Sequence, residues 1–352
     1  MPPIAATQDF KAFLDQAVAQ DARLAAAAEV LRAIAAASIE LSIVIGLGHL
    51  HSQLGASRAS TNKDGDVQKE LDIFADDLFV RAFRRAPVAA VVSEELHEPL
   101  VLDPAGPLAV AMDPLDGSSN IDANLSIGTI FSILPVLADA KDANSHFLQP
   151  GRTQIAAGFV IYGPQTSLVC ALGDGQTQIF TLDRDVGQFY HARSCPVIVK
   201  EASEYAINAS NYRHWDVPVR AFIDDCVHGA DGPLKRNYNM RWTGSLVADA
   251  YRILVRGGIF LYPGDHRDGY KEGRLRLLYE ANPVAFIVER AGGLATDCVH
   301  PILDIVPSAI HGRVPLVFGS PALVELMASY HSDPQFSAEH APLFGKRGLM
   351  RL

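Results

Sequence analysis

The eight residues from Asp113 to Asn120 read DPLDGSSN and carry the most information about the fold of this 352-residue chain. They follow an apolar run, 108–112, which predicts a buried strand that ends at the first aspartate. Asp116 follows three residues later, and Pro114 stiffens the backbone between the two acids, so both carboxylates can converge on one hard cation such as Mg²⁺. The glycine and serines offer backbone N–H groups to an anion at a helix start. The stretch therefore predicts a strand end that holds a metal ion beside a phosphate group.

Further carboxylates favour this metal site over the alternative, an ordinary turn followed by a serine-rich helix cap. Glu94 and Glu95 follow a short apolar stretch, 89–92, that predicts a second strand. Glu280 follows a buried-looking stretch, 275–279, which we interpret as a third strand. Two more acids are Asp66 in a polar loop and Asp72 on the helix after it.

Composition describes a globular protein with one large domain or two smaller ones, in which 49% of residues are hydrophobic and 20% are charged. The net charge of −10 argues against nucleic acid or an anionic membrane as the main partner. A phosphorylated substrate would then need bound metal and a few well-placed arginines. The four cysteines lie far apart without metal-ligand spacing, which indicates reduced thiols in a cytoplasmic protein: Cys170, Cys195, Cys226 and Cys298.

No signal peptide is expected, because the N-terminus lacks a basic start before an apolar stretch. No membrane span is expected either, because Glu, His or Gly interrupts each apolar passage. The protein is therefore predicted to be soluble.

Hydrophobic spacing predicts helices over 9–37, 39–50, 67–85, 217–225 and 245–255, with Asp21 capping a second helix inside the first stretch. Strands are predicted at 89–92, 108–112, 128–136, 155–161, 167–172, 178–182, 258–262, 275–279 and 316–319. Residues 54–66 are predicted to form a mobile loop. Residues 191–196 are interpreted as a connector between two domains, 1–194 and 195–352. Intermixed helices and strands indicate layered α/β or α+β packing.

Taken in order, the motifs resemble those of class I fructose-1,6-bisphosphatases over nearly the whole chain. The pattern DP(L/I)DG(S/T) alone marks a wider group of metal-dependent, lithium-sensitive sugar phosphatases, so the longer strings carry the specificity. The matching strings are NKDGD (62–66), SEE (93–95), DPLDGSSNID (113–122), SIGTIF (126–131), LQPGR (148–152), GGIFLYP (257–263) and LRLLYE (275–280). The resemblance implies an αβαβα architecture with two mixed sheets, in which the N-terminal domain binds metal and the 1-phosphate and the C-terminal domain binds the sugar and its 6-phosphate.

The resemblance also implies hydrolysis of the 1-phosphate of D-fructose 1,6-bisphosphate by metal-activated water. The implied ligands of two or three Mg²⁺ ions, for which Mn²⁺ can substitute, are Asp66, Glu94, Asp113, the carbonyl of Leu115, Asp116 and Glu280. Asp72 and Glu95 are implied to orient and deprotonate the attacking water. Such a set suits a phosphate monoester, because charge on the phosphoryl oxygens must be neutralised while water is held in line.

The substrate positions implied by the resemblance are Gly117, Ser118 and Ser119 for the 1-phosphate, and Asn208, Tyr212, Tyr262 and Arg241 for the 6-phosphate. Arg241 is expected to reach in from a neighbouring subunit of a homotetramer, the typical state of the family. Two positions depart from the family pattern: Trp242 replaces a tyrosine, and Arg274 replaces a lysine that touches substrate. Because both changes can alter the length of sugar that fits, sedoheptulose 1,7-bisphosphate stays open as a main or second substrate.

The motifs of AMP-inhibited members are not found here: residues 24–28 read LAAAA instead of Thr-Gly-Glu-(Met/Leu)-Thr, and no Lys-Tyr pair precedes the strand at 108–112. We therefore expect weak or no AMP inhibition through that site. Residues 138–147 contain no cysteine, so thiol control is not expected either.

Other functions are disfavoured by the same residues. An inositol-monophosphatase-like enzyme is less favoured, because its substrate has no second phosphate for the residues assigned to the 6-phosphate. An inactive regulator that binds sugar phosphate would not need the complete set of acids. The sequence leaves open whether the reaction serves gluconeogenesis or a Calvin-type cycle.

Overall fold

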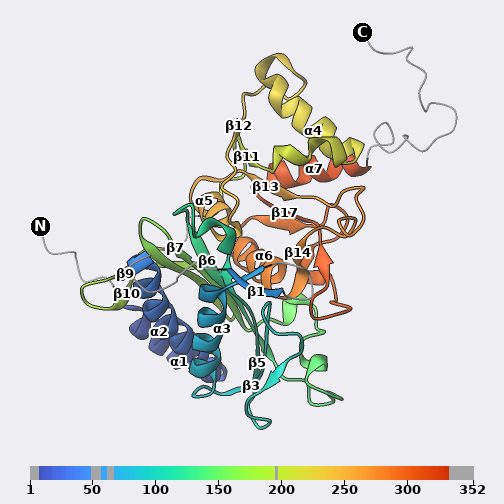
Figure 1. Cartoon of the computed structure of the whole chain (residues 1–352). Coiled ribbons are helices and arrows are strands. Elements are labelled where there is room, and N and C mark those ends of the chain that lie inside the picture. Colours follow the sequence, from blue (N-terminus) through green and yellow to red (C-terminus); the bar gives the residue numbers. More distant parts are fainter. Residues whose placement is uncertain (1–7, 49–56, 62–66, 195–196, 333–352) are drawn as a thin grey trace, which may run out of the picture.

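Two mixed β-sheets and the helices that cover them form five layers (Figure 1). The computed structural model describes residues 8–48, 57–61, 67–194 and 197–332. The helices are α1 (Phe10–Gln20), α2 (Ala25–Leu47), α3 (Glu70–Phe83), α4 (Val217–His228), α5 (Leu246–Arg256), α6 (Asn282–Arg290) and α7 (Pro321–Ser332).

The larger sheet has eight strands in the order β10-β9-β8-β7-β6-β5-β3-β4. Its strands are β3 (Val88–Ser93), β4 (Leu100–Val101), β5 (Leu108–Asp116), β6 (Ile127–Pro135), β7 (Ala156–Tyr162), β8 (Thr166–Leu172), β9 (Gln178–Asp183) and β10 (Gln188–Ser194). The strands β3 and β5 are parallel, whereas the other neighbours in this sheet are antiparallel.

The smaller sheet has five strands in the order β12-β11-β13-β17-β15. Its strands are β11 (Glu204–Ala206), β12 (Asn239–Met240), β13 (Ile259–Tyr262), β15 (Leu294–Thr296) and β17 (Leu316–Gly319). Two short pairs complete the described strands: β1 (Ser57–Thr61) with β2 (Val67–Lys69), and β14 (Leu275–Arg276) with β16 (Arg313–Val314).

The hydrophobic clusters define the order of the layers. Helices α1, α2 and α3 pack on one face of the larger sheet, where Phe79 and Phe131 belong to one core. The opposite face packs on α5 and α6, where Phe159 and Phe286 share a second core with Phe318 of the smaller sheet. Helices α4 and α7 cover the outer face of the smaller sheet. The architecture is αβαβα, which confirms the predicted fold class.

Helix α2 contradicts one expectation about membranes. The stretch Ala22–Leu47 is long and apolar enough to cross a membrane by length and composition, with a mean hydropathy of 1.9 over an 18-residue window. The expectation that Glu, His or Gly interrupts each apolar passage well short of a membrane span was therefore wrong here. Half of the apolar window is buried in the protein, and side chains such as Leu31 and Ile34 pack into the core against the larger sheet. The burial explains the composition, because a helix with a wide buried face is apolar on that face.

Several predicted boundaries change in the structure. Asp21 caps the short turn before α2, as predicted, but α2 continues without a break to Leu47 instead of ending at residue 37. Within the predicted loop 54–66, Ser57–Thr61 forms β1, and its pairing with β2 delays the start of α3 to Glu70; the other residues of that loop lie outside the described ones. Strand β10 likewise continues through Ser194, into the predicted connector.

The stretch 275–279 is not one strand. It begins as β14, and the chain then makes a π-helical turn over Leu277–Ala281, in which the N–H of Asn282 donates to the carbonyl of Leu277. Single π-helical turns are rare and occur often at functional sites. Glu280 therefore lies in a turn that leads into α6, not at the end of a strand.

Candidate active site

Three buried carboxylates meet at the end of β5. One oxygen from each of Asp113, Asp116 and Glu280 lies within 4.8 Å of the others. All three side chains are buried, with 3%, 8% and 5% of their surfaces exposed, respectively. Carboxylates are rarely buried without a compensating charge, so this donor set fits a hard, oxygen-preferring cation.

The backbone around Pro114 explains how two aspartates three residues apart reach one point. In a regular strand they would point to opposite faces of the sheet. Here the pairing of β5 with β6 shifts between Asp113 and Asp116. The Leu115 N–H donates to Oδ1 of Asp113 at 2.9 Å, and the Thr129 hydroxyl donates to the Pro114 carbonyl at 2.9 Å. Such irregularities re-aim side chains next to active sites.

Asp116 also connects the two sheets through α5. Its Oδ2 accepts hydrogen bonds from the Ser245 hydroxyl at 3.1 Å and from the Val247 N–H at 3.0 Å. Ser245 is the N-cap of α5, so the carboxylate lies at the positive end of that helix dipole. Both of these hydrogen bonds go to Oδ2, and neither uses Oδ1 of Asp116.

Arg276 is a buried cation that the sequence interpretation missed. Its guanidinium lies 2.9 Å from Oε1 of Glu94, and its backbone N–H donates to Oε2 of Glu280 at 2.6 Å. Arg276 is 8% exposed, so it offsets part of the negative charge from inside the protein. The signal was an arginine inside the apolar string LRLLYE, at a position where a buried strand ordinarily carries an apolar residue.

The electrostatics of the cluster show a deficit of positive charge. Burial, followed by repulsion from Glu94, raises the pKa of Glu280 to about 8. Burial also raises the pKa of Asp116 to about 6 and places that of Asp113 well above its usual range. One arginine does not neutralise these acids, whereas divalent cations would. The residues present therefore fit the metal ions that the motifs imply.

Further acids come together from α3 and the end of β3. Asp72 is 5% exposed on α3, and Glu95 follows β3 directly. Burial, then repulsion from Asp72, raises the pKa of Glu95 to about 8. Asp76 lies one turn after Asp72, is also buried, and has a raised pKa because of burial; it was not predicted. Asp66 lies outside the described residues.

The segment predicted to cradle the 1-phosphate is a single 3₁₀ turn, Ser118–Asn120, and not the start of an α-helix. Gly117 precedes it with φ of +76°, a left-handed conformation that glycine adopts without strain. The side-chain amide of Asn120 donates to the Gly244 carbonyl at 3.1 Å, which holds the turn against the loop before α5. The turn directly follows Asp116, so its backbone lies beside the carboxylate cluster.

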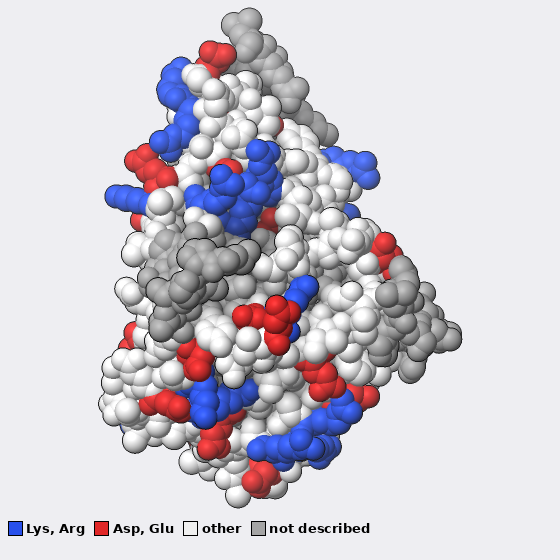
Figure 2. Space-filling view, turned by 90° about the vertical axis from the view of Figure 1, so that its left-hand side faces the viewer, with Lys and Arg blue, Asp and Glu red and all other residues white. Residues whose placement is uncertain are grey.

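A second, narrow pocket lies in the C-terminal part of the chain. It contains three of the residues predicted for the 6-phosphate or the sugar: Asn208, Tyr262 and Arg274. Other polar residues of its lining were not predicted: Asn211, Tyr270, and Arg267, whose guanidinium pairs with the carboxylate of Asp265. The carbon at the centre of each guanidinium lies over the Tyr270 ring, 4.2 Å from its centroid for Arg267 and 4.9 Å for Arg274. In Figure 2 acidic side chains gather near the middle of one face, with a basic group above them toward the C-terminal part.

Three predicted substrate residues do not line this pocket. The Tyr212 hydroxyl donates to the carboxylate of Asp224, at 2.8 and 2.9 Å from its two oxygens, and the side chain is 40% exposed. Arg241 directly follows β12, the edge strand of the smaller sheet. Its side chain is exposed, and its guanidinium donates to the Met240 carbonyl. Trp242 stacks on Phe260, with ring centroids 5.6 Å apart.

Comparisons with known proteins agree with this geometry. The chain matches the family models described as "Fructose-1-6-bisphosphatase, N-terminal domain" over residues 11–194 and "Fructose-1-6-bisphosphatase, C-terminal domain" over residues 198–332. It is 55% identical to a "Fructose-1,6-bisphosphatase class 1" of Sinorhizobium medicae, across 92% of this chain and 93% of that protein. A protein of the same description from Methylorubrum populi is also 55% identical, across 96% of each chain.

Among solved structures, the holo form of Leishmania major fructose-1,6-bisphosphatase superposes with a TM-score of 0.86 at 30% sequence identity. The match covers 94% of this chain and 100% of the Leishmania chain. Because the family models, the sequence relatives and the solved structure all span nearly the whole chain, the chain belongs to the fructose-1,6-bisphosphatase family of sugar phosphatases.

Proposed function

We propose that this chain is an enzyme that hydrolyses the 1-phosphate ester of D-fructose 1,6-bisphosphate, releasing fructose 6-phosphate and inorganic phosphate. The observation that carries the proposal is the cluster of Asp113, Asp116 and Glu280, whose oxygens lie within 4.8 Å of one another. In a chain of this family, buried acids beside a glycine turn are the arrangement that a metal-dependent phosphatase needs.

The metal-holding set is Asp66, Glu94, Asp113, the carbonyl of Leu115, Asp116 and Glu280. Family members depend on metal ions, and we propose two or three Mg²⁺ ions here, with Mn²⁺ as a substitute. When bound, these ions supply charge stabilisation at the phosphoryl oxygens and lower the pKa of a water molecule. Arg276 keeps the Glu94 carboxylate in place through their ion pair.

Asp72 and Glu95 are proposed to orient the attacking water and to accept its proton. A general base works best when its pKa lies near the working pH. Burial and the proximity of Asp72 raise the pKa of Glu95 to about 8, well above an ordinary glutamate. Its proton affinity therefore suits proton transfer near neutral pH better than that of an exposed carboxylate.

We propose that the backbone of Gly117, Ser118 and Ser119 holds the 1-phosphate and that the second pocket holds the 6-phosphate. In that pocket, the guanidiniums of Arg267 and Arg274 both lie over the Tyr270 ring, so the lining carries two positive charges. Guanidiniums bind phosphate through paired N–H groups. Arg267 therefore joins Asn208, Tyr262 and Arg274 in the proposed set, while Tyr212 contacts substrate only if it leaves Asp224.

The assembly and location are also proposed. Arg241 is exposed, and within the described residues its guanidinium donates a hydrogen bond to the neighbouring Met240 carbonyl, so the guanidinium is available to a neighbouring subunit, as in a homotetramer. Trp242 places its ring on Phe260 beside it. We propose a cytoplasmic enzyme with an N-terminal metal unit (1–194) and a C-terminal sugar unit (195–352), serving gluconeogenesis or a Calvin-type cycle.

The proposal is tested by phosphate release from fructose 1,6-bisphosphate and sedoheptulose 1,7-bisphosphate in parallel, with Mg²⁺ or with EDTA. We expect Mg²⁺-dependent release and a higher kcat/KM for the fructose compound. Comparable values would establish a bifunctional enzyme. The Asp113→Asn variant should lose activity, whereas Glu325→Gln, an exposed change on α7, should not. Absence of hydrolysis of either sugar would refute the enzyme and favour a sugar-phosphate-binding regulator.

A further inference from the structure

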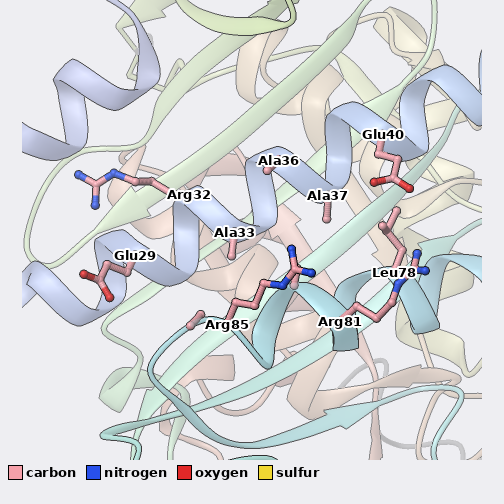
Figure 3. A pocket seen from close by; sticks show the side chains of 11 residues that line it. Glu29, Arg32, Ala33, Ala36, Ala37, Glu40, Leu78, Arg81 and Arg85 are labelled. Atoms are coloured by element: carbon pink, nitrogen blue, oxygen red, sulfur yellow. The ribbon is translucent and has the colours of Figure 1, made fainter.

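A groove of about 730 Å³ lies between α2 and α3, on the helical layer of the larger sheet. Alanines form much of its floor: Ala33, Ala36, Ala37, Ala82 and Ala86. Figure 3 shows the guanidinium groups of Arg81 and Arg85 in the space between the two helices, with Glu40 extending toward the same space from α2. The volume lies within the range of small-molecule sites, about 300–1,000 Å³.

Carboxylates hold seven other arginines of the described chain in place, but not the two at this groove. The arginines that pair with a carboxylate are Arg23, Arg32, Arg152, Arg236, Arg252, Arg267 and Arg276. In the part of the chain that the structure describes, neither Arg81 nor Arg85 has such a partner, although Glu29 and Glu40 line the same groove. Arg32 also lines the groove, but its guanidinium turns away in Figure 3 and pairs with Asp15 at 2.5 Å.

The local backbone holds these two charges close together. Arg81 lies in the last turn of α3, and Arg85 lies in the turn that follows, where its N–H donates to the Ala82 carbonyl. Residues four apart in such a turn are neighbours, and like charges at that spacing repel each other. The negative end of the α3 dipole favours one cation there. This dipole does not offset the repulsion between two guanidiniums at one groove. An anion bound between them would offset it.

We propose that this groove binds the phosphate group of a small phosphorylated molecule through Arg81 and Arg85. Guanidinium groups bind phosphate through paired, charge-assisted N–H bonds. The alanine floor would contact the apolar part of the ligand. Glu40 would accept hydrogen bonds from hydroxyls, so a phosphorylated polyol or sugar fits better than a bare hydrocarbon phosphate.

The groove is separate from both proposed phosphate positions of the active site. Its residues come from α2, α3 and the turn after α3, whereas those positions involve the turn at Gly117 and the pocket around Arg267. Helix α3 nevertheless carries Asp72 near its other end. A ligand in the groove would therefore contact the same helix that presents a proposed catalytic acid.

The test uses the full-length protein and inorganic phosphate as the probe, titrated by calorimetry in EDTA. The variant Arg81→Gln/Arg85→Gln should bind one phosphate fewer per chain, or bind at that site at least about tenfold more weakly. The control is Arg84→Gln, which removes one arginine charge from an exposed residue of the same segment outside the groove. Circular dichroism checks the fold of each variant. The titration needs no turnover, so its outcome is independent of the proposed hydrolysis.

Wild-type crystals soaked in phosphate give a second measurement that needs no variant, and density between Arg81 and Arg85 is expected. Equal stoichiometry in the double variant and the Arg84→Gln control would overturn the proposal. So would density in the crystal without binding in solution, which would mean an adventitious ion only. A smaller oligomer in the double variant with unchanged phosphate binding would also overturn it, because the groove would then be an interface between copies.

Discussion

The buried carboxylates should make the stability of the metal-free protein depend on pH in the direction opposite to ordinary acid denaturation. Glu280 has a folded-state pKa of about 8, compared with an ordinary value of 4.5. Between these values the folded state binds more protons than the unfolded state, so the free energy of unfolding falls as pH rises. The contribution is fully present below the unfolded pKa and is lost as pH rises through the folded one.

The size of this effect follows from the same numbers. One pKa unit corresponds to about 1.4 kcal/mol, so the rise from 4.5 to about 8 gives an upper value of about 5 kcal/mol for Glu280. Asp116, with a pKa of about 6, acts in the same direction over a lower pH range. The two contributions do not add, because neighbouring acids titrate together. A total loss of a few kcal/mol between about pH 5 and about pH 8 is expected.

Thermal unfolding in EDTA across this pH range measures the effect. The unfolding temperature should fall as pH rises, and saturating Mg²⁺ should abolish or reverse the fall, because the ions compete with protons for the same oxygens. Glu280→Gln should flatten the slope in EDTA, while Glu325→Gln, an exposed residue on α7, should leave it unchanged. An unfolding temperature that stays constant or rises with pH in EDTA would refute this account of the cluster.

Three further changes test individual contacts. Arg267→Gln should raise KM for fructose 1,6-bisphosphate about 10-fold to 100-fold with a small change in kcat, as expected for loss of a charged hydrogen bond, and should spare p-nitrophenyl phosphate, which lacks a second phosphate. Thr129→Val leaves the buried Pro114 carbonyl without its donor and should cost about 1–3 kcal/mol in urea unfolding; an unchanged midpoint would contradict this. Gly117→Ala strains a left-handed residue by about 1–2 kcal/mol and should lower kcat/KM in steady-state assays.

The sequence predicted the larger sheet well because its strands are short apolar runs between turn residues. The residue ranges predicted for β3, β5, β6, β7, β8 and β9 differ by a few residues from those observed. It did not predict α6, because the apolar residues of VAFIV face core on all sides and show no helical alternation. Pro283 near the start of that helix was the available signal.

The clustering of acids was predictable where one short motif carries two of them, as with Asp113 and Asp116. It was less predictable where partners come from distant segments. Arg276, Asp76 and Arg267 depend on which side chains the fold brings together, and single residues of these types carry no local pattern. Their roles became visible only through ion pairs, burial and pocket lining.

The bond between Asp116 and the start of α5 has a mechanical consequence. Asp116, a proposed metal ligand from the first half of the chain, accepts hydrogen bonds through Oδ2 from the start of a helix in the second half. These hydrogen bonds therefore connect the two halves of the chain at the carboxylate cluster. A rotation of one half against the other would drag this carboxylate out of position. If Asp116 holds metal as proposed, such a rotation would weaken metal binding, so the contact between α5 and the end of β5 is expected to persist during turnover.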